Sequence, residues 1–205
     1  MGEPEPRRHP MTAPAVTDRP SVAPADLANV AVFAALIAAM SLLPAIHVGG
    51  LTPITLQTLG VMLAGLCLGP WRGAAAVGLY LAVGIAGLPV FAGGKGGVAA
   101  LLGPTGGYLV SFLIVAFLVG LAARFVVRRG LTKLTFVWFL LACMVTRVAV
   151  TWPLGVAGIA RATGKSFGDL WATDFIFWPG DLLKAVVASL IAVAVHKAFP
   201  RLLGR

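Results

Sequence analysis

The stretch Trp178-Pro-Gly-Asp-Leu-Leu-Lys184 opens an apolar run that continues to Phe199. Pro179 suits the first turn of a helix, because its missing N–H would have no partner there. Asp181 and Lys184 are three residues apart, so both lie on one face of that helix. A charge at the middle of a membrane helix costs about 2.5–3.5 kcal/mol, so the pair needs partners or a polar cavity. These residues alone fit a ligand site at the outer mouth of a bundle as well as a structural ion pair between two helices.

The composition is that of an integral membrane protein. Of the 205 residues, 59% are hydrophobic and only 11% are charged, whereas a soluble domain carries roughly 25% charged residues. The net charge of +9 does not indicate nucleic-acid binding, because the basic residues are not gathered into one patch with aromatics. Cys67 and Cys143 each lie inside an apolar run, so the sequence predicts neither a disulfide framework nor a metal site.

Six apolar segments predict an all-α bundle of six transmembrane helices. A spanning helix needs about 20 residues, and the segments are too continuous for the alternating strands of a barrel. Residues 1–26 are rich in Pro, Ala and Arg and predict a disordered tail, followed by the membrane domain over residues 27–205. The predicted helices cover residues 27–46, 54–68, 73–90, 106–127, 134–156 and 179–199.

The placement of basic residues predicts that both termini are cytoplasmic. Most of the 16 Lys and Arg residues fall in the tails and in alternate loops, whereas Lys95, Arg161 and Lys165 fall on the opposite side. Cytoplasmic loops carry the excess of positive charge. The sequence therefore predicts a multi-pass membrane protein with Asp181 near the outer face.

Three further side chains within or beside the spans are candidates for a polar site. Gln57 enters the short second segment, and Arg147 lies inside the fifth. Polar and ionisable groups inside a membrane need partners and often mark functional sites. Arg147 is equally compatible with an ion pair inside the bundle, for example with Asp181. Trp178 fits either an interfacial anchor or the wall of an apolar ligand site.

A glycine-rich stretch separates the third and fourth segments. Seven glycines lie between residues 93 and 107, and Lys95 is followed by Gly96 and Gly97. A phosphate-binding loop would instead have Gly-Lys-Ser/Thr before a helix. Irregular backbone at the membrane is tolerated where it lines a cavity. We expect a lid or wall on the outer side, with a flexible re-entrant connector as the alternative.

The first segment carries small residues at four-residue spacing, namely Ala31, Ala35 and Ala39. Small residues allow close approach between membrane helices, although such a pattern also arises by chance. The residues therefore allow, without requiring, a surface for docking a partner helix.

Five motifs in this order and spacing resemble the BioY family, the biotin-binding S components of energy-coupling factor (ECF) transporters. The resemblance extends from about residue 27 to the end of the chain. The motifs are Pro53-Ile-Thr-Leu-Gln-Thr-Leu-Gly60, Leu68-Gly-Pro70, Gly87-Leu-Pro-Val-Phe91, Gly103-Pro-Thr-Gly-Gly-Tyr108 and Pro179-Gly-Asp-Leu-Leu-Lys184.

The resemblance implies a six-helix protein that captures biotin from outside and has no cofactor and no enzymatic activity of its own. It implies docking on a membrane-embedded T component driven by two ATPase subunits, through Ala31, Ala35 and Ala39. Uptake without these partners is an open alternative. The expected partners are biotin, these subunits and the lipid bilayer of the bacterial cytoplasmic (inner) membrane. No nucleic acid is expected.

Asp181 and Lys184 carry over as ligand residues, with Asp181 accepting the ureido N–H groups of biotin and Lys184 donating to the ureido oxygen. Lys95 or Arg161 is available to the biotin carboxylate. One departure is Ala157-Gly158, where the family would have a bulky aromatic. The full expected substrate-binding set is Asp181, Lys184, Gln57, Phe91, Gly96, Gly97, Thr105, Gly106, Tyr108, Arg147 and Trp178.

Two other functions compete with biotin uptake. The first is capture of another vitamin by an S component of the same architecture. The second is an intramembrane enzyme, such as a protease or a lipid transferase. The sequence has no Gly-x-Ser-x-Gly nucleophile motif and no metal-binding His pair, which argues against the second.

Overall fold

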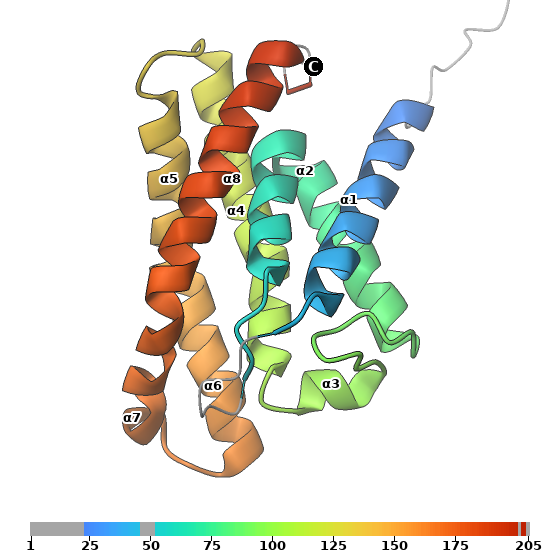
Figure 1. Ribbon diagram of the computed structural model, residues 1–205, viewed down its shortest axis with the longest axis vertical. Helices are drawn as coiled ribbons and strands as arrows, with labels where there is room; N and C mark the ends of the chain where they lie inside the picture. The colour runs from blue at the N-terminus through green and yellow to red at the C-terminus, as the bar shows by residue number, and fades with distance from the viewer. Residues whose placement is uncertain (1–22, 46–51, 201, 204–205) are drawn as a thin grey trace, which may run out of the picture.

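The computed structural model describes residues 23–45, 52–200 and 202–203, and within these residues it is helical, with no strand (Figure 1). The predicted tail up to residue 22 lies outside the described residues. The helices are α1 (Pro24–Leu42), α2 (Gln57–Ile85), α3 (Val98–Leu102), α4 (Gly106–Arg128), α5 (Thr135–Thr146), the π-helix η1 (Arg147–Thr151), α6 (Trp152–Thr163), α7 (Phe167–Leu170), the 3₁₀ helix η2 (Trp171–Phe177) and α8 (Trp178–Ala198).

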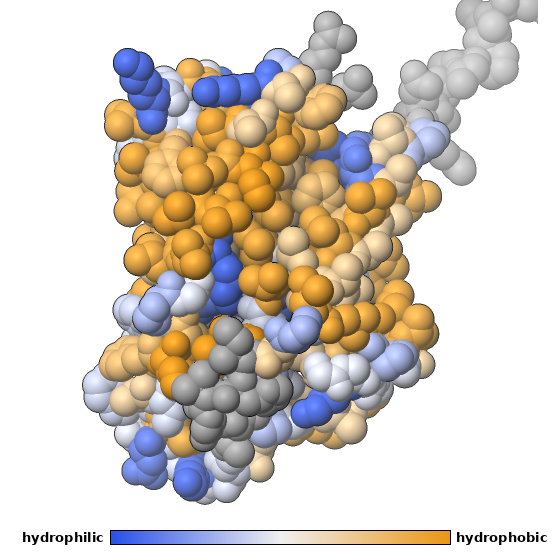
Figure 2. All heavy atoms as spheres, viewed as in Figure 1, coloured by the Kyte–Doolittle hydropathy of each residue, from blue (hydrophilic) through white to orange (hydrophobic). Residues whose placement is uncertain are grey.

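The structure confirms the all-helical membrane class but not the number of spans. In the described part of the chain, five helical stretches are long and apolar enough to cross a membrane. Figure 2 shows a broad hydrophobic belt, with hydrophilic residues gathered toward the two ends of the molecule. Such a surface suits a protein whose middle faces lipid. The stretches are Pro24–Leu42, Gln57–Ile85, Gly106–Arg128, Thr135–Thr163 and Phe167–Ala198.

The second and third predicted segments form one element, α2, which is broken at Gly69. Gly69 has φ 80° and ψ −174°, and Pro70 follows it. A Cβ on Gly73 would lie 2.8 Å from the carbonyl oxygen of Ala64, although nine residues of straight helix span about 13.5 Å. The chain therefore reverses here, and the arms 57–68 and 71–85 lie side by side.

Arg72 joins three distant parts of the chain at one end of the molecule. Its Nη1 lies 2.7 Å from Oδ1 of Asp26 in α1, and its Nη2 donates to the carbonyl of Leu202. The start of α1, the turn of α2 and the end of the described chain thus meet at the end of the molecule opposite α3 and α7 (Figure 1).

Glycines bring the backbones of the central helices together. A Cβ on Gly65 in α2 would lie 2.7 Å from the Ala116 carbonyl in α4, and a Cβ on Gly120 would lie 2.4 Å from Gly69. Real Cβ contacts are not this short, so only glycine fits at these positions. This close packing of α2 on α4 holds the ends of both helices around the site described next.

Candidate ligand-binding site

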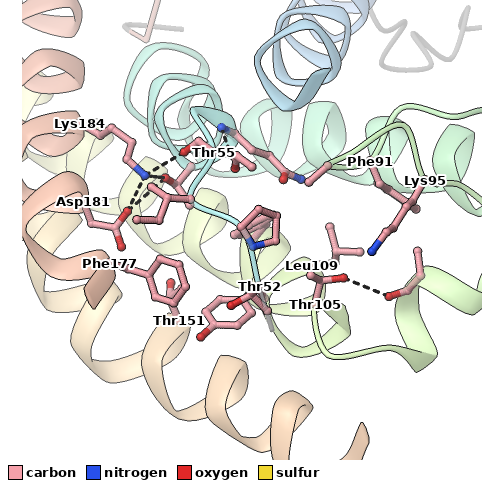
Figure 3. Close-up of a pocket in the computed structure, with 18 of the residues that line it drawn as sticks. Thr52, Thr55, Phe91, Lys95, Thr105, Leu109, Thr151, Phe177, Asp181 and Lys184 are labelled. Carbon is pink, nitrogen blue, oxygen red and sulfur yellow. Dashed lines mark hydrogen bonds and ion pairs between the residues drawn. The ribbon is translucent and has the colours of Figure 1, made fainter. Parts of the chain in front are cut away.

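A cavity of about 70 Å³ lies near the end of the bundle at which α3, α6 and α7 are found (Figure 3). The loop before α2, the loop before α3, α4, η1, η2 and α8 all contribute to its wall. The lining residues are Thr52, Pro53, Ile54, Thr55, Gln57, Thr58, Phe91, Ala92, Lys95, Ala100, Thr105, Tyr108, Leu109, Phe112, Arg147, Thr151, Phe177, Asp181 and Lys184.

Lys184 is held by three acceptors. Its Nζ lies 2.8 Å from Oδ1 of Asp181, 2.9 Å from the Thr55 carbonyl and 2.9 Å from Oγ1 of Thr58. An ammonium group has three N–H donors, so each of them has a partner. Lys184 therefore joins α8 to the start of α2 and presents Asp181 to the cavity.

Arg147 is the second cation of the site and is only 2% exposed. Its Nε donates to Oδ2 of Asp181 at 2.6 Å, and its Nη2 donates to Oδ2 of Asp174 at 2.5 Å. Its Nη1 has no hydrogen-bond partner among the described residues. The ion pair with Asp181 that the sequence allowed is therefore present, and one buried donor of a cavity-lining residue is left over.

Asp174 is the functional candidate that sequence reasoning missed. It is completely buried and accepts hydrogen bonds from Arg147, from the Tyr108 hydroxyl at 2.7 Å and from Nε1 of Trp178 at 3.1 Å. It lies in η2, outside the six predicted helices. The available signal was an acidic residue directly before the apolar run Phe175-Ile176-Phe177.

The four buried charges of this cluster cancel. Arg147 and Lys184 face Asp174 and Asp181, each cation within 2.8 Å of a carboxylate oxygen. A buried ion pair needs such geometry, because desolvation costs several kcal/mol per ion. The cluster therefore lies in the apolar part of the protein as a neutral, hydrogen-bonded unit.

Gln57 and Phe91 form another part of the cavity wall. Nε2 of Gln57 donates to the Tyr80 hydroxyl at 2.7 Å, and that hydroxyl donates to the Val90 carbonyl at 3.2 Å. The Phe91 ring packs edge-on against Tyr80, with 5.4 Å between centroids. Tyr80, which the sequence analysis did not single out, thus fixes both predicted residues from behind.

The structure places the predicted site residues in two groups. Asp181, Lys184, Gln57, Phe91, Thr105, Tyr108 and Arg147 line the cavity, whereas Gly96, Gly97, Gly106 and Trp178 do not.

The three glycines shape the loop instead of touching the cavity. A Cβ added to Gly96 would lie 2.4 Å from the carbonyl oxygen of Leu88, and a Cβ added to Gly106 would lie 1.8 Å from the carbonyl oxygen of Leu101. Gly97 has a φ of 80°. These positions need glycine for backbone packing and for a left-handed conformation.

Trp178 lies behind the charged cluster. Besides its bond to Asp174, its ring packs edge-on against Trp152 and Phe175 at 6.2 and 5.1 Å between centroids. Trp178 therefore lies outside the cavity lining, and its assignment to a ligand wall stays a prediction.

The C-terminal end of the fifth predicted segment contributes one residue to the cavity. Thr151, the last residue of η1, lines it, but no residue of α6 is found in the lining. At Gly158 in α6, a Cβ would lie 2.5 Å from the Gly107 backbone nitrogen in α4. The Ala157-Gly158 pair therefore lies where helices pack closely, outside the cavity wall.

Of the two cations predicted for the biotin carboxylate, the structure places one at the cavity and one away from it. Lys95 lines the cavity, whereas Arg161 donates to the Leu101 carbonyl at 2.9 Å and is not in the lining.

The site combines hydrogen-bonding groups with apolar walls. Asp181, Lys184 and Arg147 lie on one side, and Phe112 and Phe177 are among the apolar lining residues. This combination is typical of pockets for small organic ligands, which are mostly apolar with a few placed polar groups. Such pockets measure about 300–1,000 Å³, so this cavity of about 70 Å³ is smaller than is usual for a vitamin-sized ligand.

Comparison with known proteins gives one consistent result. The sequence matches the model of the BioY family over residues 12–201. It is 42% identical over 182 residues to the biotin transporter BioY of Rhizobium etli, covering 88% of this chain and 97% of that protein. It is 41% identical to the biotin transporter BioY of Rhodobacter capsulatus, covering 83% and 93%. The crystal structure of the S-component for biotin from an ECF-type ABC transporter has a TM-score of 0.78 and 31% identity, covering 84% of this chain and 91% of that one.

Proposed function

Because the chain belongs to the BioY family, we propose that it is a transport protein that captures biotin outside the cell with high affinity and takes part in its uptake. The observation that carries the proposal is the buried Asp181–Lys184 pair, which opens onto a cavity with apolar walls. Biotin combines a ureido group with an apolar sulfur-containing ring, and the site offers partners for both.

Asp181 is the acceptor for the ureido N–H groups. A carboxylate has about four acceptor sites. Lys184 and Arg147 occupy one on each oxygen, and the Thr58 hydroxyl also donates to Oδ1 in a longer contact of 3.4 Å. Charge-assisted hydrogen bonds are roughly twice as strong as neutral ones. Asp181 can therefore keep its ion pairs and still accept from the ligand.

The ureido oxygen is assigned to Lys184 together with Nη1 of Arg147. Lys184 has no spare donor and must exchange its bond to Thr55 or Thr58 for one to the ligand. Nη1 of Arg147 has no such bond to give up. Arg147 thus supplies a donor that the sequence-based assignment gave to Lys184 alone.

We assign docking on a T component to the exposed alanine face of α1. Ala31, Ala35 and Ala39 are all exposed, and small side chains leave room for a partner helix. Two ATPase subunits would then drive uptake, with a solitary mode as the alternative.

We further propose that the two arms of α2 serve as two short spans. This gives six spans, both termini in the cytoplasm and a location in the bacterial inner membrane. The three parts joined by Arg72 would then lie on the cytoplasmic side, which agrees with the distribution of basic residues.

The test is ligand binding by the purified full-length protein. Mass spectrometry of the protein as isolated identifies any copurified vitamin, and titration calorimetry compares biotin with thiamine and riboflavin. Biotin alone is expected to bind. Binding of another vitamin in place of biotin would contradict the proposal and favour a different S-component specificity.

A further inference from the structure

A tight turn presents Lys95 to the cavity. The Phe91 N–H donates to the Lys95 carbonyl at 2.9 Å, and the Lys95 N–H donates to the Phe91 carbonyl at 3.2 Å. Gly93 and Gly94 between them have φ of 74° and 69°, a conformation that glycine adopts without strain. Phe91 is 2% exposed and anchors the turn in the core. The backbone of Lys95 is therefore fixed while its side chain lines the cavity.

The rest of the loop is also tied down. The Gly97 N–H donates to the Gly84 carbonyl at 2.7 Å, and Gly96 lies against the Leu88 carbonyl. A lysine on this loop is thus held beside the cavity by the same glycines that the sequence indicated as a wall.

Among the cations that line the cavity, Lys95 differs from Arg147 and Lys184 in its lack of an ion-pair partner among the described residues. Arg147 and Lys184 are neutralised by Asp174 and Asp181. No carboxylate of the described residues forms an ion pair with Lys95. The cavity and its ion-pair partners therefore carry one uncompensated positive charge, at Lys95.

Lys95 lies far across the cavity from the Asp181–Lys184 pair (Figure 3). Figure 3 shows Lys95 and the Asp181–Lys184 pair on opposite sides of the cavity, and the Lys95 side chain points toward Thr105 and Leu109. A ligand whose ureido group contacts Asp181 would extend its other end toward Lys95.

We propose that Lys95 is a specificity residue that selects a ligand with a single negative charge at the end remote from the ureido group. The inference rests on the proposed function, and for biotin that charge is the carboxylate. Lys95 is exposed to solvent, so its interaction with the carboxylate is partly screened by salt. Binding at the ureido end does not depend on Lys95.

The experiment compares two ligands and three proteins. Biotin and biotin methyl ester share the ureido head, but the ester lacks the charge. Both are titrated by calorimetry into the wild-type protein, Lys95→Gln and Lys165→Gln. Lys165 is the matched control, because it is also an exposed outer lysine and does not line the cavity.

Lys95→Gln is expected to weaken biotin binding about tenfold, as the loss of one partly exposed charge-assisted bond implies. Its affinity for the methyl ester should stay within about twofold of wild type, and Lys165→Gln should match wild type for both ligands. Raised salt should weaken the wild type toward Lys95→Gln for biotin only.

Equal losses for both ligands in Lys95→Gln would overturn the inference, because they would reflect a distorted loop. An unchanged biotin affinity would overturn it as well. If the wild type binds neither ligand, the proposed function fails and the inference fails with it. The two kinds of failure are distinguished by the wild-type titration alone.

Discussion

Asp181 forms ion pairs with two cations that come from different parts of the chain. Lys184 lies one turn further along the same helix, whereas Arg147 comes from η1, 34 residues earlier. Removing one partner of a buried ion pair costs about 3–5 kcal/mol, because it leaves the other charge uncompensated. A single substitution in this cluster is therefore expected to lower both the stability of the protein and its affinity for the ligand. Variants that keep the charge balanced distinguish the effect on stability from the effect on binding.

Asp181→Asn is expected to weaken biotin binding roughly 5- to 150-fold, because each unpaired buried donor of the ligand costs about 1–3 kcal/mol. The double variant Asp181→Asn with Lys184→Met removes one charge of each sign and leaves Arg147 paired with Asp174. It should insert normally and still bind poorly in titration calorimetry. Near-native affinity in the double variant would show that the pair is purely structural.

Asp174→Asn should lower stability and affinity together. The variant leaves Arg147 and Lys184 to share one carboxylate, so the expected loss lies near the lower end of about 3–5 kcal/mol for a broken buried pair. The melting temperature followed by tryptophan fluorescence measures the first effect, and biotin titration measures the second. Asp169→Asn is the control, since Asp169 is exposed and bonds only to Ser166 among the described residues. A melting temperature unchanged by Asp174→Asn would contradict the role given to this residue.

At the scale of elements, the break in the α5–α6 helix coincides with the site. The π-helix η1 begins at Arg147 and ends at Thr151, and both residues line the cavity. Single-turn π-helices often occur at functional sites. Here the wider turn lies where Arg147 meets both carboxylates.

Ala35→Trp on α1 should abolish uptake while leaving biotin binding to the isolated protein intact. The bulky ring would block close approach of a partner helix. Ala194→Trp is the matched control, because Ala194 is also an exposed alanine, on α8. Radiolabelled biotin uptake by cells and calorimetry on purified protein provide the two measurements. Uptake that survives Ala35→Trp would place docking elsewhere or show that the chain works without a T component.

At the scale of the whole molecule, Arg72 joins three parts of the chain at one end, and the candidate cavity lies toward the other. The hydrophobic belt of Figure 2 separates the two ends. This polarity suits a protein that takes its ligand on one side of a membrane and has its termini on the opposite side.

Labelling of introduced cysteines tests this orientation. Lys165→Cys should react with a membrane-impermeant maleimide in intact cells, whereas Lys133→Cys should react only after lysis. Both positions are exposed, and the native Cys67 and Cys143 are buried. Labelling of Lys133→Cys in intact cells, with Lys165→Cys protected, would reverse the proposed topology.

Local patterns in the sequence were sufficient for the helical class and for the charged residues that line the candidate cavity. Apolar segments report the membrane directly, because every backbone polar group in lipid must be satisfied within a helix. Asp181, Lys184 and Arg147 stood out because charges are rare in such segments. The family followed from five motifs, each of which lies within a short stretch of the chain.

Only the tertiary structure decided which distant groups meet. The reversal at Gly69, the partners of Arg147 and the burial of Asp174 depend on contacts between segments far apart in the chain. Asp174 looks like a loop residue until Tyr108 and Arg147 are brought to it by the packing of α4 and η1. Gly96 and Gly97, which the sequence predicts at the ligand, give the loop that carries Lys95 its backbone conformation. A sequence shows which side chains need partners in a membrane, whereas the choice of partner is made by packing in three dimensions.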